Sequence, residues 1–273
     1  MDKKTHYNPD YHQLNRKAKR CPVNGNSKQA DNLLGRLLPR SRKLAPICHD
    51  PDLFEELAET ISAIKSAIDW GQNLFEASYV VFDTETTGIK PYKGDEIISI
   101  GAVIIEDAQI SEEIFFYQLV NPRRPIPALA QKITGLDDRA VKDQPEIIAV
   151  LHEFLKFTGP RILLAHNAPF DLAFINSKVA EAIGRRIVNP VIDTVLLTSA
   201  LYYAIGDYSL ENLADRFSLS LDGRHNALAD AHIVASLYLK LLPELKARGV
   251  NTLQQLADLF SEIDLTKGYP LIF

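Results

Sequence analysis

Two acidic side chains separated by a single residue follow the apolar run YVVF. Asp83 and Glu85 come directly after residues 79–82, whose β-branched and aromatic side chains predict a strand. Because side chains alternate along an extended chain, both carboxylates are expected on one side of it. Carboxylates aimed at one point repel each other unless a proton or a cation lies between them. A hard divalent ion such as Mg²⁺ or Mn²⁺ suits this place because it prefers oxygen ligands, although the pair alone is more typical of a solvated turn.

A second segment, HNAPFD at residues 166–171, offers a third carboxylate. It follows the apolar run ILLA, which predicts another buried strand. Parallel strands bring their carboxyl ends to one edge of a sheet, so Asp171 is expected to reach the first pair. Each residue also has an ordinary interpretation. His166 and Asn167 are typical of hydrogen bonds that fix a loop, Phe170 is typical of a core, and Asp171 is typical of a helix N-terminus.

A third segment, HNALAD at residues 225–230, opens a predicted helix after the turn LDGR. Asp230 lies a turn beyond His225, so the histidine can move over a site whose metal ion the aspartate holds. A single histidine is more often structural, and neutral imidazole can also be a metal ligand. With three acids directed at a metal site, a general base becomes the favoured interpretation of His225.

The elements that must position these segments alternate between strand and helix. Strands are predicted at residues 79–82, 96–106, 112–120 and 162–165, with a last short one at 191–192. Helices are predicted near residues 128–133, 146–157, 170–183, 194–204, 210–217 and 228–242. This alternation indicates an α/β layer fold, in which at least two of the first three strands are antiparallel.

Charge and composition divide the chain unevenly. Residues 1–50 hold 11 Lys/Arg and 4 Asp/Glu, whereas the remainder holds 19 and 31. We expect residues 1–49 to be a basic flexible tail, 50–77 a helical lead-in with a helix from Pro51 to Asp69, 78–245 the main domain, and 246–273 a C-terminal helix and tail. A duplex-binding domain is usually strongly basic, so this acidic domain either does not bind nucleic acid or meets phosphate through bound cations.

Several classes of protein are disfavoured by the sequence. It has no run of 18 apolar residues and no apolar stretch behind its basic N-terminal residues, so we expect neither a membrane span nor a secretory signal. Cys21 and Cys48 are too few for a disulfide framework and lack zinc-ligand spacing. A reducing cytoplasm is the expected compartment, with no membrane partner.

Taken together, the segments DTETTG at 83–88, HNAPFD at 166–171 and HNALADA at 225–231 resemble the DEDDh exonuclease family, most closely the bacterial DNA polymerase III epsilon-subunit group. The resemblance covers about Tyr79 to Pro243 and includes KITGL at 132–136 and SLENLA at 209–214. It implies an RNase H-like fold, with a mixed five-stranded sheet flanked by helices. It also implies a 3′–5′ exonuclease that uses two divalent cations, Mg²⁺ or Mn²⁺.

The resemblance also implies roles for single residues. Asp83 would bridge both ions, Glu85 and Asp230 would hold the ion that activates water, and Asp171 would serve the second ion. His225 would take the proton from the attacking water. The pocket for the terminal nucleotide would be lined by six residues: Thr86, Thr87, Gly88, His166, Asn167 and Phe170.

The substrate implied is the 3′ end of single-stranded nucleic acid, with DNA favoured and with proofreading or repair as the setting. The five catalytic positions do not separate DNA from RNA, so trimming of RNA 3′ ends is the alternative. A non-catalytic scaffold is disfavoured, because a binding module gains nothing from clustered carboxylates. A DNA polymerase and a sliding clamp are the partners considered. The segment from Gln255 to Phe260 loosely resembles clamp-docking peptides, although its leucine spacing favours a packed helix.

Overall fold

The computed structural model describes residues 51–267, with side chains described through residue 261. The tail predicted at residues 1–49, the two cysteines and the last residues 268–273 lie outside this described part. Within it, no helix combines the length and the apolar character needed to cross a bilayer.

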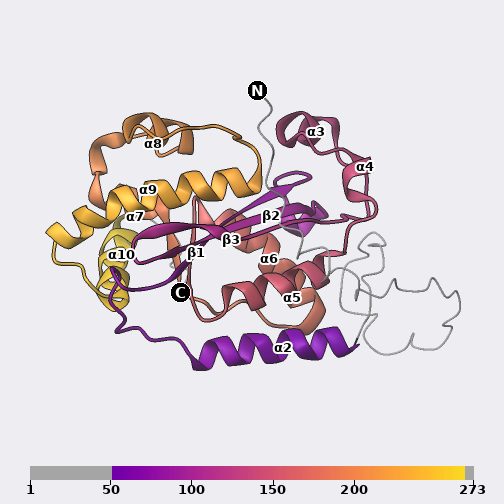
Figure 1. Cartoon of the computed structure of the whole chain (residues 1–273), viewed down its shortest axis with the longest axis horizontal. Helices are drawn as coiled ribbons and strands as arrows, with labels where there is room; N and C mark the ends of the chain where they lie inside the picture. Colours follow the sequence, from indigo (N-terminus) through magenta and orange to yellow (C-terminus); the bar gives the residue numbers. More distant parts are fainter. Residues whose placement is uncertain (1–50, 268–273) are drawn as a thin grey trace, which may run out of the picture. The chain divides into compact units, whose positions relative to one another are not determined.

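A single five-stranded sheet forms the centre of the described chain (Figure 1). Its strand order is β3-β2-β1-β4-β5; the first three strands are antiparallel neighbours, while β1, β4 and β5 run parallel. The mixed sheet with flanking helices confirms the predicted fold class. The bounds are Tyr79–Thr86 for β1, Ile97–Glu106 for β2, Gln109–Leu119 for β3, Ile162–Ala165 for β4 and Val191–Asp193 for β5.

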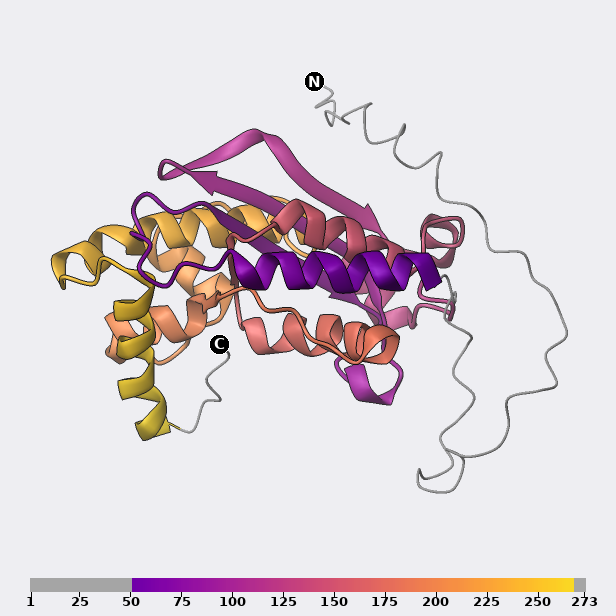
Figure 2. The same ribbon diagram turned by 90° about the horizontal axis from the view of Figure 1, so that it is seen from below.

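Helices cover both faces of the sheet, and one helix adds an outer layer. Helix α9 (Ala227–Ala247) packs across β1 and β2 on one face, beside α7 (Thr194–Leu201). On the other face lie α5 (Ile147–Thr158) and α6 (Ala168–Ile183), and α2 (Pro51–Ser66) lies outside them, as Figure 2 shows. The remaining elements are η1 (Pro91–Lys93), α3 (Ala128–Thr134), α4 (Asp138–Val141), η2 (Tyr203–Ile205), α8 (Leu210–Arg216) and α10 (Leu253–Lys267).

Some helix boundaries differ from the predicted ones, and one short helix was not predicted. Helix α2 ends at Ser66 rather than Asp69, and α4 follows a capping aspartate, Asp137, that the periodicity did not reveal. Helix α9 continues through Pro243 to Ala247, beyond the predicted end at residue 242. A proline inside a helix costs about 3 kcal/mol or more, and the complete burial of Leu245 in the core is the packing that opposes this cost.

The segment from Gln255 to Phe260, which loosely resembles clamp-docking peptides, lies in helix α10. Leu256 and Phe260 are 1% and 3% exposed and belong to the main hydrophobic core. The Gln255 Oε1 atom accepts hydrogen bonds from the backbone N–H groups of Asn251 (2.8 Å) and Thr252 (3.1 Å), which closes the helix entrance. These side chains are committed to the fold, so the packed-helix interpretation holds and this segment offers no exposed docking peptide.

A glycine on β2 allows the N-terminus of α9 to lie directly on the sheet. Gly101 pairs with Asp83 in the β1–β2 register. A Cβ atom at Gly101 would lie 2.2 Å from the Leu228 backbone nitrogen and 2.3 Å from the Ala227 carbonyl carbon, far inside van der Waals contact. The Asn226 side chain caps the same helix end by accepting from the N–H groups of Leu228 and Ala229. The lack of a side chain at Gly101 therefore lets the first turn of α9 lie against β2, next to Asp83 of β1.

We predict that Gly101→Ala moves the start of α9 away from the sheet. Overpacking of this kind costs about 1–3 kcal/mol of unfolding free energy, because backbone rather than a flexible side chain must shift. Binding of Mn²⁺ should weaken as well, since Asp230 moves with the helix. Urea unfolding and calorimetric Mn²⁺ titration measure the two effects.

Gly71→Ala is the matched control, because its added Cβ would meet only the flexible Asp69 side chain, at 3.3 Å. A Gly101→Ala protein as stable as the control, with unchanged affinity for Mn²⁺, would contradict this account of the helix position.

Candidate active site

Three of the carboxylates singled out in the sequence meet at the end of β1. Asp83 and Glu85 project from the same side of this strand, and Asp230 reaches them from the first turn of α9. Each of the three offers a ligand oxygen, and these oxygens lie within 4.8 Å of one another. Glu85 is 9% exposed and Asp230 is 3% exposed. The structure thus places these acids as the sequence predicted.

Asp171 lies next to this cluster, in the first turn of α6. Its Oδ1 atom accepts two hydrogen bonds from Thr84, from the backbone N–H at 3.0 Å and from the hydroxyl at 2.6 Å. Asp171 is 3% exposed, so these bonds fix a buried carboxylate against β1. Sequence reasoning missed Thr84, whose position between two acids was the only signal of its role.

Burial and mutual repulsion make the four carboxylates reluctant to ionise. Burial raises the pKa of Asp83 well above its usual range, and the charges of Asp171, Asp230 and Glu85 raise it further. Burial, with the charge of Asp230, raises the pKa of Glu85 to about 7. Burial likewise raises the pKa of Asp171 to about 7 against the opposing hydrogen bonds from Thr84. Such a cluster binds either protons or cations at neutral pH.

The donor set fits a divalent cation. The oxygen-rich cluster matches the ligand preference of Mg²⁺ and Mn²⁺. Asp230 Oδ1 is buried and has no hydrogen-bond partner in the described part of the chain. A buried carboxylate oxygen without a donor is costly, and an ion held there would satisfy it. Asp83, Glu85 and Asp230 are therefore the residues suited to hold an ion, with Asp171 beside them.

Arg224 is a part of this site that the sequence did not single out. Its Nη1 atom pairs with Asp230 Oδ2, and its Nη2 atom pairs with Glu211 Oε1 of α8 at 2.5 Å. The guanidinium opposes the upward pKa shifts of Asp83, Glu85 and Asp230. Arg224 lies in a turn without periodicity, so no helical or strand pattern marked it.

His225 occupies a strained junction between the turn and α9. Its φ of 65° is left-handed, which non-glycine residues seldom adopt. Its backbone N–H donates to Asp230 Oδ2 at 3.2 Å, whereas its side chain is exposed and does not line the cleft beside the acids. The structure therefore places the backbone of His225 against Asp230, and its imidazole is close enough to Asp230 and Glu211 to act on both carboxylates electrostatically.

A cleft of about 530 Å³ opens beside the acids, within the range of roughly 300–1,000 Å³ common for ligand pockets. Three residues of the predicted nucleotide pocket, His166, Asn167 and Phe170, line it. Its other walls are Asp83, Thr84, Asp171, Val195, Tyr208, Ser209, Leu210, Glu211 and Arg224. The segment from Tyr208 to Glu211 was not predicted as part of the site, although it overlaps the family-like stretch SLENLA.

His166 is fixed at the floor of this cleft in a neutral form. Its Nδ1 atom lies 3.0 Å from Thr194 Oγ1, and the backbone of Tyr208 is a second partner. Burial, with the nearby charge of Arg224, lowers the pKa of His166 to about 4. The ring therefore holds the loop before α8 in place and is poorly suited to accept a proton near neutral pH.

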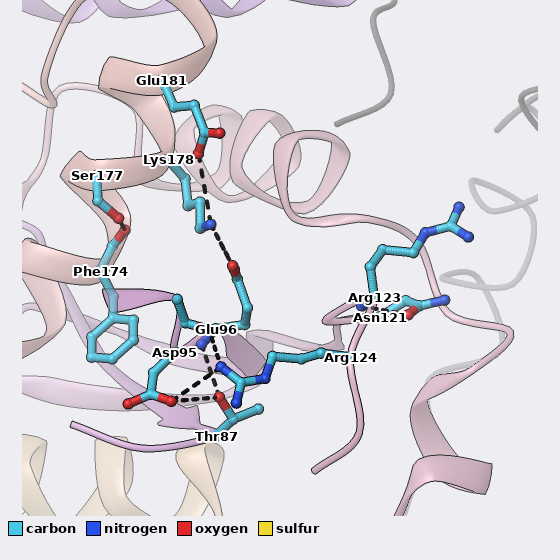
Figure 3. A network of polar contacts seen from close by, with 11 residues as sticks. Thr87, Asp95, Glu96, Asn121, Arg123, Arg124, Phe174, Ser177, Lys178 and Glu181 are labelled. Carbon is cyan, nitrogen blue, oxygen red and sulfur yellow. Dashed lines mark hydrogen bonds and ion pairs between the residues drawn. The ribbon is translucent and has the colours of Figure 1, made fainter. Parts of the chain in front are cut away.

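The other three predicted pocket residues, Thr86, Thr87 and Gly88, are not among the residues that line this cleft, and each makes a contact within the β1–β2 connection. Thr87 Oγ1 accepts from the Glu96 N–H at 2.9 Å, and a Cβ atom at Gly88 would lie 2.4 Å from Asp95 Oδ2. Glu96 in turn pairs with buried Lys178 of α6 at 2.7 Å, as Figure 3 shows. The Thr86 hydroxyl donates to the Gly88 carbonyl at 2.6 Å. This network anchors the β1–β2 connection to α6 and so fixes the end of β1.

Comparison with known proteins identifies what the domain is similar to. A family model described as an exonuclease, RNase T, matches residues 80–238. A DNA polymerase III subunit epsilon-like protein of Rhodobacter capsulatus is 44% identical over 182 residues, which cover 66% of this chain and 26% of the relative. The DNA polymerase III subunit epsilon of Aquifex aeolicus is 36% identical over 173 residues, which cover 63% of this chain and 84% of the relative.

The chain spans about a quarter or less of the length of the first relatives it matches, such as 14% of a PolC-type DNA polymerase III from Caldanaerobacter subterraneus. Among solved structures, exonuclease X in complex with 5′ overhanging duplex DNA has a TM-score of 0.53 and 27% sequence identity. The similarity covers 67% of this chain and 99% of that one. A nuclease domain described as a DEDDh family member, 19% identical with a TM-score of 0.55, shares the fold.

We predict that the free energy of unfolding of the metal-free domain falls as pH rises from about 4.5 to about 7. The lower value is the ordinary pKa of a glutamate, and the upper value is the raised pKa of Glu85 in the folded chain. The folded chain keeps a proton that the unfolded chain has released, so each step upward in pH favours unfolding. Glu85→Gln should therefore be more stable than the native chain at pH 8, by on the order of 2 kcal/mol. Urea unfolding in EDTA at pH 5 and pH 8 measures this.

The exposed change Glu59→Gln on α2 serves as the control and should follow the native profile. Equal stability of the native domain at both pH values would show that the acid cluster does not govern its unfolding.

Proposed function

We propose that this chain, which belongs to the RNase T family of exonucleases, removes nucleotides from the 3′ end of single-stranded DNA. The family model spans most of the domain, and the relatives named as epsilon subunits place the domain among DEDDh-type 3′–5′ exonucleases. The observation that carries the proposal is the meeting of Asp83, Glu85 and Asp230 beside a cleft large enough for a nucleotide.

DNA is favoured over RNA by the relatives. Exonuclease X, the solved structure at 27% identity, is described in complex with duplex DNA that carries a 5′ overhang, and several relatives are named as parts of DNA polymerase III. Sugar preference depends on a contact at the 2′ position, which the catalytic carboxylates do not make. A direct comparison of DNA and RNA is therefore part of the test below.

We propose that the four carboxylates hold two divalent cations, Mg²⁺ or Mn²⁺. Bound in this way, such ions stabilise charge on the attacking and leaving oxygens of a phosphodiester. Asp83 has the central position for a bridging ligand, because the charges of Glu85, Asp230 and Asp171 all act on it. Thr84 keeps Asp171 turned toward the site, and Asn226 keeps the first turn of α9 in place.

We propose that His225 is the general base that takes a proton from the attacking water. Its imidazole is exposed at the entrance of α9 and is close enough to Asp230 to act on that carboxylate electrostatically. His166 is disfavoured for the same task, because its ring is buried and its pKa is lowered to about 4. Imidazole is the side chain that enzymes use most often as a general base.

A bacterial replicative DNA polymerase is the partner we propose for the domain, since its relatives are named as epsilon subunits. Co-elution with a bacterial polymerase III catalytic subunit in size-exclusion chromatography would support this. Separate elution at micromolar concentrations of both proteins would refute it.

The activity itself is tested with 5′-labelled single-stranded DNA and RNA of equal sequence, in Mg²⁺, Mn²⁺ or EDTA. We expect a ladder that shortens from the 3′ end with either metal, faster on DNA, and no ladder in EDTA or with Asp83→Ala. A faster ladder on RNA would reassign the substrate, and no ladder on either oligomer would refute the exonuclease activity of this chain.

We predict that His225→Ala lowers the rate constant of cleavage by about 10²–10⁴ while it leaves the affinity for Mn²⁺ unchanged. The reason is that the imidazole moves a proton and is not a ligand of the acid cluster. Single-turnover cleavage and calorimetric Mn²⁺ titration separate the two quantities. His232→Ala, which removes an imidazole further along α9 and outside the cleft lining, should cleave at the native rate. Near-native cleavage by His225→Ala across the pH range would disprove the assigned role.

A further inference from the structure

Arg224 bridges an acid of the catalytic cluster and an acid of the cleft wall. One end of its guanidinium pairs with Asp230, which is 3% exposed, and the other pairs with the more exposed Glu211. Arg224 also lines the cleft that Asp83 and Asp171 line. The same cation therefore contacts a proposed metal ligand and faces the space proposed for the substrate.

Two buried polar atoms at this bridge lack hydrogen-bond partners in the described part of the chain. They are Arg224 Nε, a donor, and Asp230 Oδ1, an acceptor. An unsatisfied buried donor is costly, so each of these atoms indicates a missing ligand. A bound cation would satisfy Asp230 Oδ1, and a bound anion would satisfy the N–H of Arg224 Nε.

We propose that Arg224 is a substrate-binding residue that leaves Asp230 when a divalent ion binds there, and then contacts the phosphate of the terminal nucleotide. This inference rests on the proposed function. In the metal-free chain the guanidinium neutralises part of the acid cluster, as an ion would. Once an ion occupies Asp230, the two cations repel each other, and Arg224 Nη1 joins Nε as a free donor.

Glu211 is what keeps the released arginine in the cleft. Its carboxylate holds Arg224 Nη2 at 2.5 Å from the side opposite Asp230, so this ion pair survives the exchange. The guanidinium is planar and rigid, so its released Nη1 can donate to a phosphate oxygen while Nη2 stays on Glu211. Nε remains a further donor on another edge of the same group. Glu211 thus acts as a positioning residue that touches the arginine, and Arg224 provides the contact with the anion.

The exchange predicts that Arg224→Gln shifts two affinities in opposite directions. Mn²⁺ should bind roughly tenfold more tightly, because no charged hydrogen bond to Asp230 must be broken first. Thymidine 5′-monophosphate, added with saturating Mn²⁺, should bind roughly tenfold more weakly, because a charge-assisted hydrogen bond to its phosphate is lost. Isothermal titration calorimetry measures both dissociation constants without any need for turnover.

The control for a general change of charge is Arg216→Gln, an exposed residue at the end of α8, which should leave both affinities close to native. Glu211→Gln provides a second test that preserves the arginine: binding of thymidine 5′-monophosphate should weaken, and Mn²⁺ should bind no more tightly than to the native chain. Circular dichroism melting establishes that each variant is folded, and Glu211→Gln decides alone if Arg224→Gln does not fold.

The inference is overturned if Arg224→Gln weakens both ligands, which is the result of a purely structural role. It is equally overturned if binding of thymidine 5′-monophosphate is unchanged, or if Arg216→Gln gives the same opposite shifts. These outcomes are distinct from failure of the proposed function, which appears as the absence of a 3′ ladder with the native chain.

Discussion

Asp83, Glu85 and Asp230 hold ligand oxygens within 4.8 Å of one another, and each charge makes the others harder to ionise. A folded chain tolerates such a cluster only where packing elsewhere offsets the repulsion. Here strands β1, β2 and β4 and the core that α9 packs against are almost completely buried. The cluster therefore lies at the edge of a rigid sheet. There, bound cations rather than movement of the strands can relieve the repulsion among the carboxylates.

Short polar and steric contacts hold the carboxylates close together in spite of their repulsion. Gly101 lets α9 approach β1 closely, Thr84 fixes Asp171, and the Thr87 and Glu96 contacts tie the end of β1 to Lys178 on α6. Except for the local contact between Thr87 and Glu96, these contacts join segments far apart in the sequence. Loss of any one would let the carboxylates move apart, which their charges favour. The site is thus maintained by its supporting contacts and not by attraction among its own members.

The difference between the carboxylates and the contacts that support them explains which residues could be predicted from the sequence. Asp83 and Glu85 were predictable because a period of two along a strand fixes their side, and Asp230 because helical spacing sets it a turn beyond His225. The alternation of strand and helix patterns predicted an α/β layer fold, and the resemblance to DEDDh exonucleases implied the mixed five-stranded sheet. Arg224 could not be found in this way, since its ion pairs depend on the approach of α8 and α9. The same holds for Thr86 to Gly88, whose contacts with Asp95 and Glu96 depend on the closure of a loop.

The domain carries more acidic than basic residues, so its attraction for a polyanion such as nucleic acid needs a physical explanation. Several of its cations are already paired: Lys178 with Glu96, Arg124 with Asp95, and Arg224 with two acids at once. The first two fix the loop after β1 and are not available to phosphate without loss of structure. Arg224 differs, because one of its partners is a proposed metal ligand. Under the proposed exchange, Arg224 would present its charge to the substrate after ions have bound, so the cleft would attract a nucleic-acid 3′ end more strongly once the acid cluster is loaded.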